Sequence, residues 1–594
     1  MHKVAYLKFS GILSLLCNLL HIGFFVQHVT IHLKEGNMAK AKKVKVRTGK
    51  RYRPGRADDH YDAIVVGSGI GGLTNGALLS LLGKKVCVLE QHYTAGGYTH
   101  AYEREGFEWD VGVHYIGEVH KPSTMKRMFD VISEGRLKWA PMDEVYDKII
   151  LKDKEFHFVA GRDNFIEELS KHFPEERQMI TDYVQLIRKI SSETPKFFAG
   201  QAMPKWMSKC YNLIRPFLVS KEFFKNTREV LEGMTSNQEL ISVLTGQWGN
   251  YGQTPRDASF LMHALIAKHY LAGGAYPVGG AADIARTIIP TIQKSGGEVF
   301  TYADVEEIIV ENNVAKGVRM VDGSEIFADT IFTNAGFMNT IEKLLPEASK
   351  KKHNVESWKK NLYRSSAHLG IYAGFEGTSE ELGLSNANLW IYPDGDHEKN
   401  LDAYRADPNE EFPLVYISFP SSKDPDWENR FPGKSTVEIV TPAQMEWFEK
   451  WDGTEWQKRG DDYEAFKKDL SDRLMEKLFE RHPQLRDKLV YSELSTPLST
   501  NWYQKNSGGE MLALDHFVER FKESCLHPQM PIKNLYLTGS DAMTAGVGGA
   551  LMGGVMSTMC LLGLKNGKQV MELFKNYQEP KETQTEKNEQ TEAA

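Results

Sequence analysis

Cysteine is scarce in this chain, and the few cysteines are scattered. The 594 residues include five of them, Cys17, Cys87, Cys210, Cys525 and Cys560, and no two form a C-x-x-C pair. An odd number of widely spaced cysteines argues against a disulfide framework or a zinc site, so we expect a reducing compartment and no metal. The sequence also lacks an N-x-S/T sequon and has a formal net charge of −7, so nothing indicates glycosylation or binding to nucleic acid.

Long hydrophobic runs are equally rare, with one exception near the N-terminus. Residues 9–26, "FSGILSLLCNLLHIGFFV", are at the lower limit of the roughly 17–25 residues that a spanning helix needs, and no small-residue cleavage site follows them. Residues 40–56 then carry nine Lys and Arg, which would hold the body of an anchored protein on the cytoplasmic side. We therefore expect a membrane-associated protein. The alternative is that Met38 is the true start and the protein is soluble and cytoplasmic.

The next stretch has the pattern of a strand, a helix and a second strand. Residues 61–66 and 85–89 are apolar on both faces, as strands of a parallel sheet are, and residues 73–82 have helical length and apolar density before Gly83. Residues 276–336 return to this style, with "NN" and "DG" turns that predict two hairpins, and so do residues 534–563. The chain is therefore predicted to be an α/β protein, with one Rossmann-like nucleotide domain assembled from three segments.

A second, mixed α+β domain is predicted to be inserted in two pieces, because residues 160–270 read as helices and residues 345–525 mix helices with strands. The polar, aromatic-free end of the chain predicts a disordered tail. The predicted division is an N-terminal apolar segment and basic linker at 1–57, nucleotide domain at 58–160, 271–345 and 526–575, substrate domain at 161–270 and 346–525, and tail at 576–594.

A glycine motif stands between the first strand and its helix. Gly67, Gly69 and Gly72 form G-x-G-x-x-G, which permits a tight turn, close approach of a pyrophosphate and helix–strand packing. Glu90 follows at the tip of the second strand, where a carboxylate accepts hydrogen bonds from ribose hydroxyls and repels a 2′-phosphate. This pattern predicts a site for FAD or NAD rather than NADP.

Two further glycine-rich stretches favour FAD. Gly96 and Gly97 follow Glu90 closely, and residues 539–554, "GSDAMTAGVGGALMGG", place Asp541 and a helix start after the last predicted strand. The alternative is that this late stretch is only a close-packed helix end. No second G-x-G-x-x-G stands at a strand–helix junction, so we expect no stably bound NAD(P)H. NAD(P)H that binds transiently, or another protein, is then the candidate electron donor.

Residues 109–117, "WDVGVHYIG", place polar side chains about a dozen residues after Gly97. We expect Asp110 to fix the return of the chain to the cofactor, and His114 and Tyr115 to face the flavin or the adjoining cavity. Since an imidazole can donate or accept a proton near neutral pH, His114 and Tyr115 are the candidate catalytic residues. The alternative is that His114 only bonds to the flavin or to a backbone carbonyl.

The combination "VVGSGIGGL", "VCVLEQHYTAGG", "FEWDVGVHYIG", "GGAYPVGGAADI" and "NLYLTGSDAMTAGVGGALMGG" resembles the FAD-dependent carotenoid and retinoid oxidoreductases over roughly residues 58–565. "HYIG" makes the chain most similar to the retinol saturase branch, although Trp109 replaces the usual Phe. The resemblance implies cofactor contacts, and the residues expected to make them are Gly67, Gly69, Gly72, Glu90, Gln91, Gly96, Gly97, Asp110, Val305, Asp541 and Gly548.

The resemblance implies reduction of a C=C bond in a lipophilic polyene, by hydride from reduced flavin plus a proton. A carotenoid desaturase or isomerase on the same scaffold is the alternative enzyme, and a prenyl-protein escort or GDP-dissociation-inhibitor-like binding protein is the alternative of another class. Residues 205–225 mix Lys and Arg with Trp, Leu and Phe, as segments at a lipid interface do. More simply, they form helices whose apolar face packs on the core and whose basic face is solvated.

Overall fold

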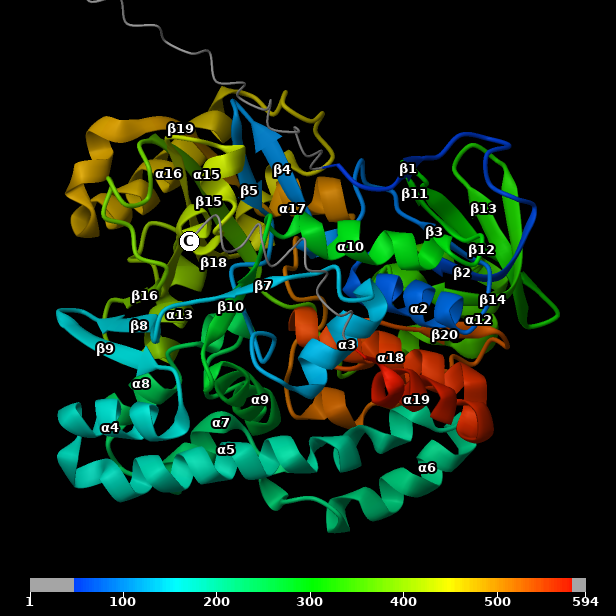
Figure 1. The fold of residues 1–594 in the computed structure, drawn as a ribbon, viewed down its shortest axis with the longest axis horizontal. Helices are drawn as coiled ribbons and strands as arrows, with labels where there is room; N and C mark the ends of the chain where they lie inside the picture. The colour runs from blue at the N-terminus through cyan, green and yellow to red at the C-terminus, as the bar shows by residue number, and fades with distance from the viewer. Residues whose placement is uncertain (1–46, 579–594) are drawn as a thin grey trace, which may run out of the picture. The chain divides into compact units, whose positions relative to one another are not determined.

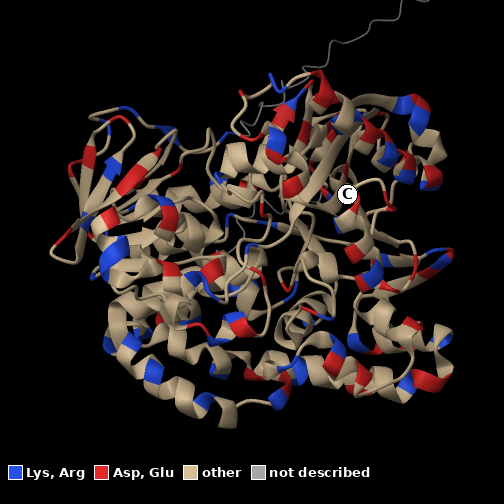
Figure 2. Cartoon of the chain, turned by 180° about the vertical axis from the view of Figure 1, so that it is seen from behind, with Lys and Arg blue, Asp and Glu red and all other residues tan. Residues whose placement is uncertain are grey.

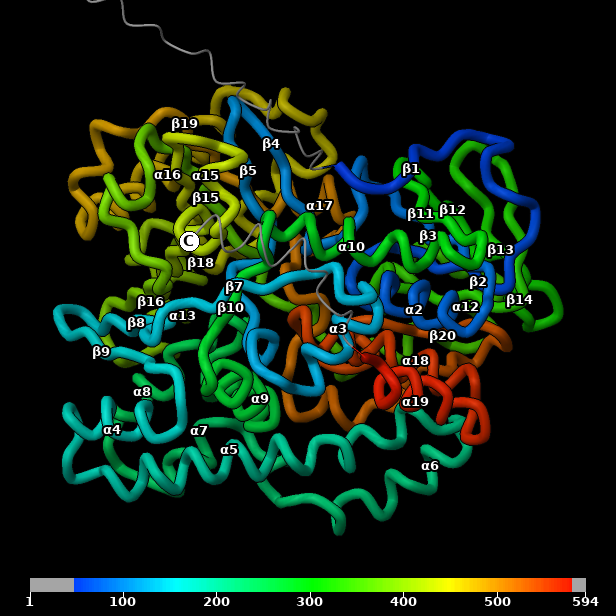
Figure 3. The backbone as a smooth tube through the Cα atoms, viewed as in Figure 1, coloured from blue at the N-terminus to red at the C-terminus, as the bar shows by residue number. Residues whose placement is uncertain are grey.

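The computed structural model describes residues 47–578, and its largest sheet is built from three distant parts of the chain. The strand order is β1-β11-β3-β2-β14-β13-β12, with β20 paired to β14. The strands are β1 (Lys50–Arg51), β2 (His60–Val66), β3 (Val86–Leu89), β11 (Glu298–Thr301), β12 (Val305–Glu311), β13 (Val314–Met320), β14 (Glu325–Thr333) and β20 (Leu535–Leu537). β2, β3, β11, β14 and β20 pair in parallel, while β12, β13 and β14 form the two predicted hairpins. The predicted three-segment α/β architecture is confirmed (Figures 1 and 3).

Three helices cover one face of this sheet around a shared apolar core. They are α2 (Ile70–Leu81), α10 (Ala282–Gln293) and α18 (Gly546–Asn566). The buried Asn75 of α2 donates from Nδ2 to Gly554 O at 2.9 Å and to Thr558 Oγ1 at 2.8 Å, which ties α2 to α18. Among the described helices α18 alone is long and apolar enough to cross a membrane by length and composition, and its buried side packs on α2.

A second, seven-stranded sheet has the order β19-β15-β18-β17-β16-β8-β9. Its strands are β8 (Val145–Leu151), β9 (Lys154–Val159), β15 (Ala367–Glu376), β16 (Asn388–Tyr392), β17 (Val415–Ser418), β18 (Lys434–Ala443) and β19 (Leu489–Ser495). The structure thus places residues 145–159 in this sheet rather than with the nucleotide-domain segment 58–160 to which we assigned them. Their short apolar pattern carries no information about which sheet they join. The other predicted boundaries stay predictions.

Helices from residues 162–270 and from the later half of the chain accompany this sheet. They are α4 (Arg162–His172), α5 (Arg177–Phe198), α6 (Lys205–Ile214), α7 (Thr227–Glu232), α8 (Gln238–Leu244), α9 (Phe260–Tyr270), α13 (His397–Ala406), α14 (Pro420–Lys423), α16 (Asp461–Arg481) and α17 (Pro497–Gln504). Short elements connect the sheets, among them β4 (Ala101–Arg104), β5 (Phe107–Asp110), β6 (Ile116–Gly117), α3 (Thr124–Ser133), β7 (Trp139–Pro141) and β10 (Gly274–Pro277), and α19 (Lys568–Asn576) follows α18.

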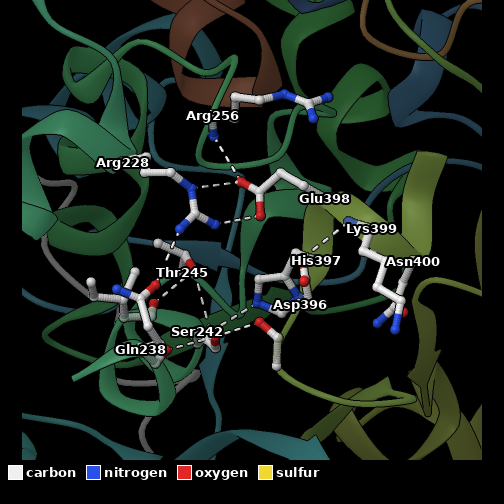
Figure 4. A network of polar contacts seen from close by, with 12 residues as sticks. Arg228, Gln238, Ser242, Thr245, Arg256, Asp396, His397, Glu398, Lys399 and Asn400 are labelled. Carbon is white, nitrogen blue, oxygen red and sulfur yellow. Dashed lines mark hydrogen bonds and ion pairs between the residues drawn. The ribbon is translucent and has the colours of Figure 1, made fainter. Parts of the chain in front are cut away.

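Polar contacts join the helices of residues 162–270 to α13, which comes from the later half of the chain (Figure 4). Glu398 of α13 accepts hydrogen bonds from Arg228 Nε at 3.2 Å and from Arg256 N at 2.9 Å. His397 contacts Ser242 O of α8 at 3.0 Å. Because Glu398 is buried and its oxygens are matched by donors, these contacts fix α13 against α7 and α8 rather than leaving a charge unpaired. The predicted N-terminal anchor at 9–26 and the first part of the basic run, residues 40–46, lie outside the described residues.

Candidate active site

One cavity of about 770 Å³ begins at the carboxyl ends of β2 and β3 and extends to the second sheet. Gly67, Gly69 and Glu90 line one end, and Trp248, Trp390 and Tyr416 are among the residues that line the other. Its volume falls in the range of roughly 300–1,000 Å³ that is typical of ligand sites. A nucleotide and an apolar molecule can therefore meet in the same space.

We call the two loops at residues 67–72 and 96–97, which close one end of this cavity, the glycine cradle. Gly67 has φ +97°, and a Cβ on Gly97 would lie 2.8 Å from Gly69 Cα, so the backbone there leaves no room for side chains. A Cβ on Gly72 would lie 2.2 Å from Gly67 O, which makes Gly72 the packing glycine rather than part of the cavity lining. No side chain caps α2, so the N–H groups of its first turn remain available to an anion.

Glu90 connects the two glycine loops. Its Oε2 accepts from Ser68 N at 2.9 Å and from Ser68 Oγ at 2.7 Å, and its Oε1 accepts from His92 N at 2.9 Å. Gly96 N in turn donates to Ser68 Oγ at 3.0 Å. The carboxylate lies at the tip of β3 in the cavity lining, where it is placed to meet the ribose of a bound nucleotide.

The other predicted cofactor residues divide into two groups. Gln91, Gly96, Val305 and Gly548 line the cavity, and the first residues of α18 line it beside Gly548. Asp110 and Asp541 do not line it.

Both carboxylates outside the lining are engaged by the protein itself. Asp541 Oδ2 accepts from Phe337 N at 2.6 Å, and its Oδ1 accepts from Leu514 N at 3.2 Å. Asp110 Oδ1 accepts from Ala281 N at 3.0 Å, which fixes β5 against the start of α10. In this structure both residues hold segments of the chain together next to the cavity.

His114 and Tyr115, the candidate catalytic residues, both lie in the cavity lining. The buried Nδ1 of His114 is 2.9 Å from Glu438 Oε2, but the contact lacks the alignment of a hydrogen bond, and among the described residues neither atom has a hydrogen-bond partner. Burial lowers the pKa of His114 to about 3 and raises the pKa of Glu438. The imidazole is therefore neutral at pH 7, and the carboxyl of Glu438 holds its proton to a higher pH than usual.

Tyr115 rests on a set of buried polar side chains that we call the polar floor. The polar floor consists of Asp147, Gln247, Asn388, Lys423 and Glu438. Asp147 accepts from Tyr115 Oη at 2.7 Å, from Gln247 Nε2 at 2.6 Å and from Asn388 Nδ2 at 2.9 Å. Burial nevertheless raises the pKa of Asp147 to about 6.

Lys423 links the polar floor to the backbone of His114. Its ammonium donates to His114 O at 3.1 Å, to Ser418 Oγ at 2.6 Å and to Asn388 Oδ1. Three acceptors match the three N–H groups of an ammonium, while burial lowers its pKa to about 7. Buried groups of this kind are costly unless paired, and they gather at functional sites.

Reasoning from the sequence missed the polar floor. Its five members come from five different places, namely β8, the turn after α8, β16, α14 and β18, and no spacing relates them. One signal was present: Asp147 in "VYDKIIL" and Glu438 in "STVEIVTP" are the single carboxylates of strands rich in β-branched and apolar residues, and both are fully buried.

The fold and the cavity together define a Rossmann-type dinucleotide-binding protein whose nucleotide site opens into a largely apolar compartment. Residues 65–132 match the family model described as an NAD(P)-binding Rossmann-like domain. An oxidoreductase from Methanosarcina mazei shares the fold with a TM-score of 0.57 at 18% identity, covering 84% of this chain and 99% of that one. A putrescine oxidase mutant shares it with a TM-score of 0.55 at 14% identity, covering 87% and 99%.

Sequence relatives narrow this class to one family. The chain is 35% identical over 544 residues to all-trans-retinol 13,14-reductase of Danio rerio, covering 88% of this chain and 89% of that protein. It is 33% identical over 528 residues to a Danio rerio protein named inactive all-trans-retinol 13,14-reductase, covering 85% and 86%. A chloroplastic prolycopene isomerase of Daucus carota is 28% identical over 468 residues, covering 76% and 71%. The chain belongs to the all-trans-retinol 13,14-reductase family, the retinol saturases, as its resemblance to that branch predicted.

Proposed function

We propose that the protein is an FAD-dependent reductase that saturates a C=C bond of retinol or of a related isoprenoid. The observation that carries this proposal is the single cavity that joins the glycine cradle to an apolar compartment. FAD is favoured over NAD because two further glycine segments, at residues 96–97 and 546–549, line the same cavity. Gly67, Gly69, Glu90 and Val305 would hold the nucleotide half.

When bound, reduced FAD supplies the hydride for such a reaction. The protein would supply the dry compartment and the proton. His114 and Tyr115 are both neutral at pH 7, because burial lowers the pKa of the first and raises that of the second. They present hydrogen-bonding groups rather than charges to an apolar substrate. Glu438, whose pKa burial raises, stands behind His114 as the proton source, while Asp147 accepts the hydrogen bond of Tyr115 Oη.

The reductant and the place of action complete the proposal. NAD(P)H acting transiently, or a protein donor, would reduce the flavin, since the described residues hold one Rossmann-like nucleotide site. We further propose that the enzyme works at a membrane surface, because retinoids and carotenoids partition into lipid and the cavity lining is largely apolar.

The test is product analysis with purified full-length protein that carries FAD. The protein is reduced under anaerobic conditions and incubated in detergent with all-trans-retinol, with a carotene and with a poly-cis-carotene. We expect retinol to gain two hydrogens while the carotenes are unchanged. A poly-cis-carotene that changes geometry with the reduced protein would replace the reductase by an isomerase. A carotene that loses hydrogens in a parallel incubation with oxidised FAD, which accepts them, would replace it by a desaturase.

Two other outcomes would overturn the proposal in different ways. A protein that stays colourless after addition of FAD would support the escort or GDP-dissociation-inhibitor alternative. A protein that binds FAD and turns yellow but leaves every polyene unchanged would resemble the relative that is named inactive. A Glu90→Ala variant serves as the control that loses flavin, because it removes the carboxylate that holds Ser68 of the first glycine loop by two hydrogen bonds and His92 N by a third.

A further inference from the structure

Large apolar side chains stand in solvent along α6 and the turn that follows it. They are Trp206, Leu213, Ile214, Phe217 and Leu218, with exposed fractions between 41% and 87%. We call these five residues the apolar ridge. The simpler expectation, that the apolar side of residues 205–225 packs on the core, holds for Phe223 and Phe224 but is wrong for these five residues. Clustered exposed apolar residues of this size mark a contact with a membrane or a partner, because water alone disfavours them.

The charge around the apolar ridge has one sign. Between Glu193 and Glu222 the chain has no Asp or Glu, but it has Lys196, Lys205, Lys209, Arg215 and Lys221. In Figure 2 the helix at the lower left, α6 seen from behind, carries blue bands and no red ones. None of the ion pairs among the described residues involves Lys196, Lys209 or Lys221. An apolar strip bordered by unpaired lysines suits an anionic lipid surface.

A single layer of aromatic rings separates the apolar ridge from the active-site cavity. Arg215, beside the ridge, lies with Cζ 4.2 Å from the ring centre of Phe197 and donates from Nη2 to Phe521 O at 3.0 Å. The next residue along the chain, Phe198, packs against the rings of Phe197 and Phe521 and lines the cavity. Ser191 and Thr194, one to two turns earlier on α5, line the cavity as well.

We propose that the apolar ridge docks on an anionic phospholipid bilayer and that the Phe197–Phe198–Phe521 layer is the entrance through which a lipophilic substrate passes from the bilayer into the cavity. This inference rests on the proposed function only for the identity of the substrate. The docking itself rests on exposure and charge. A lipid bilayer fits better than a protein partner, because the lysines surround the ridge without a pattern of acidic groups to pair with a protein surface.

Docking is tested with a fluorophore placed on α6 itself, so that the N-terminal segment cannot give the signal. Cys210 is exposed in α6, whereas Cys87 and Cys560 are buried. Full-length protein with Cys17→Ser and Cys525→Ser is labelled at Cys210 with an environment-sensitive dye and mixed with vesicles of phosphatidylcholine and phosphatidylserine. We expect a blue shift of the emission that high salt weakens. Protein that sediments with the vesicles without any shift of the dye would overturn the inference.

The entrance is tested with two matched triple variants. The ridge variant carries Leu213→Ser, Phe217→Ser and Leu218→Ser. The control carries Tyr363→Ser, Leu489→Ser and Val490→Ser, which are exposed apolar residues elsewhere and do not line the cavity. We expect the ridge variant to lose about tenfold in rate with vesicle-borne retinol and to match the control with retinol in detergent.

The detergent arm separates the two proposals. Equal losses of rate in vesicles and in detergent, or a control as slow as the ridge variant with vesicles, would overturn the entrance. Absence of activity in detergent for the unmodified protein would instead contradict the proposed function, and the dye experiment would still decide whether the ridge docks.

Discussion

The glycine cradle lines the cavity, whereas the polar floor lies behind the cavity wall formed by His114 and Tyr115, and the two are made in different ways. The cradle consists of backbone from residues 67–72 and 96–97, held by one carboxylate, Glu90. The polar floor consists of side chains that β8, the turn after α8, β16, α14 and β18 bring together from residues 147 to 438. A site made of closely packed backbone has no room for an added atom. A site made of side chains can accept a substitution without losing the fold, and the substitution then changes the rate of the reaction or its pH dependence. Mutations in the glycine cradle should therefore weaken cofactor binding. Mutations at His114, or in the polar floor behind it, should change the turnover rate or the pH dependence of the protein.

We expect the largest effect on activity from a substitution of His114, in the cavity wall. His114→Ala removes the ring that lies between Glu438 and the cavity, and we expect kcat to fall by about a hundredfold with flavin content unchanged. The measurement is the anaerobic rate of retinol saturation beside the absorbance ratio of flavin to protein. A wild-type kcat in this variant would show that His114 takes no part in the reaction. Loss of flavin would show that His114 supports cofactor binding instead.

The second effect is at the cradle. Gly97→Ala places a Cβ 2.8 Å from Gly69 Cα at a φ of +56°, and we expect flavin affinity to fall at least tenfold, about 1.4 kcal/mol or more. Gly433→Ala is the matched control, because Gly433 has a similar φ of +68° and no atom within 4 Å of the added Cβ. Fluorescence titration with FAD measures both. Equal losses would show that backbone strain, and not the closeness of the two loops, weakens binding.

The third and smallest effect is a dependence of stability on pH. Burial lowers the pKa of Lys423 from 10.5 to about 7, so the unfolded chain takes up the proton first as the pH falls. The stability of the wild type relative to Lys423→Met should therefore decrease by about 1 kcal/mol between pH 8.5 and pH 7.5 and level off below pH 7. Urea unfolding of both proteins at these pH values measures the difference. A difference that does not change with pH would show that Lys423 keeps its ammonium form throughout.

These contrasts also explain which features the sequence could predict. The cradle was predictable because G-x-G-x-x-G and Glu90 act within one strand–helix–strand unit, where spacing determines geometry. The helix after it was predicted at 73–82 and begins at Ile70, because the uncapped glycines already adopt helical conformation. Figure 3 shows the three chain segments of this domain side by side, as predicted.

The polar floor and the apolar ridge could not be predicted in the same way. Lys423 reaches His114 O across 309 residues of sequence, and no local pattern reports such a contact. Residues 205–218 have the amphipathic pattern of a core helix and of a lipid-facing one alike, and only the neighbouring elements decide between them. Asp541 illustrates a third case, since its glycine-rich surroundings suggested a cofactor contact while two backbone amides occupy its oxygens.

The most direct test of the central claim is a single turnover without air. Protein-bound FAD is reduced with one equivalent of dithionite, mixed with all-trans-retinol, and followed by its visible absorbance while the retinoid is analysed by mass. We predict that oxidised flavin returns at the rate at which retinol gains two hydrogens, in equal amounts, and that it does not return without retinol. Flavin that stays reduced in the presence of retinol, in a protein fully loaded with FAD, would contradict the account.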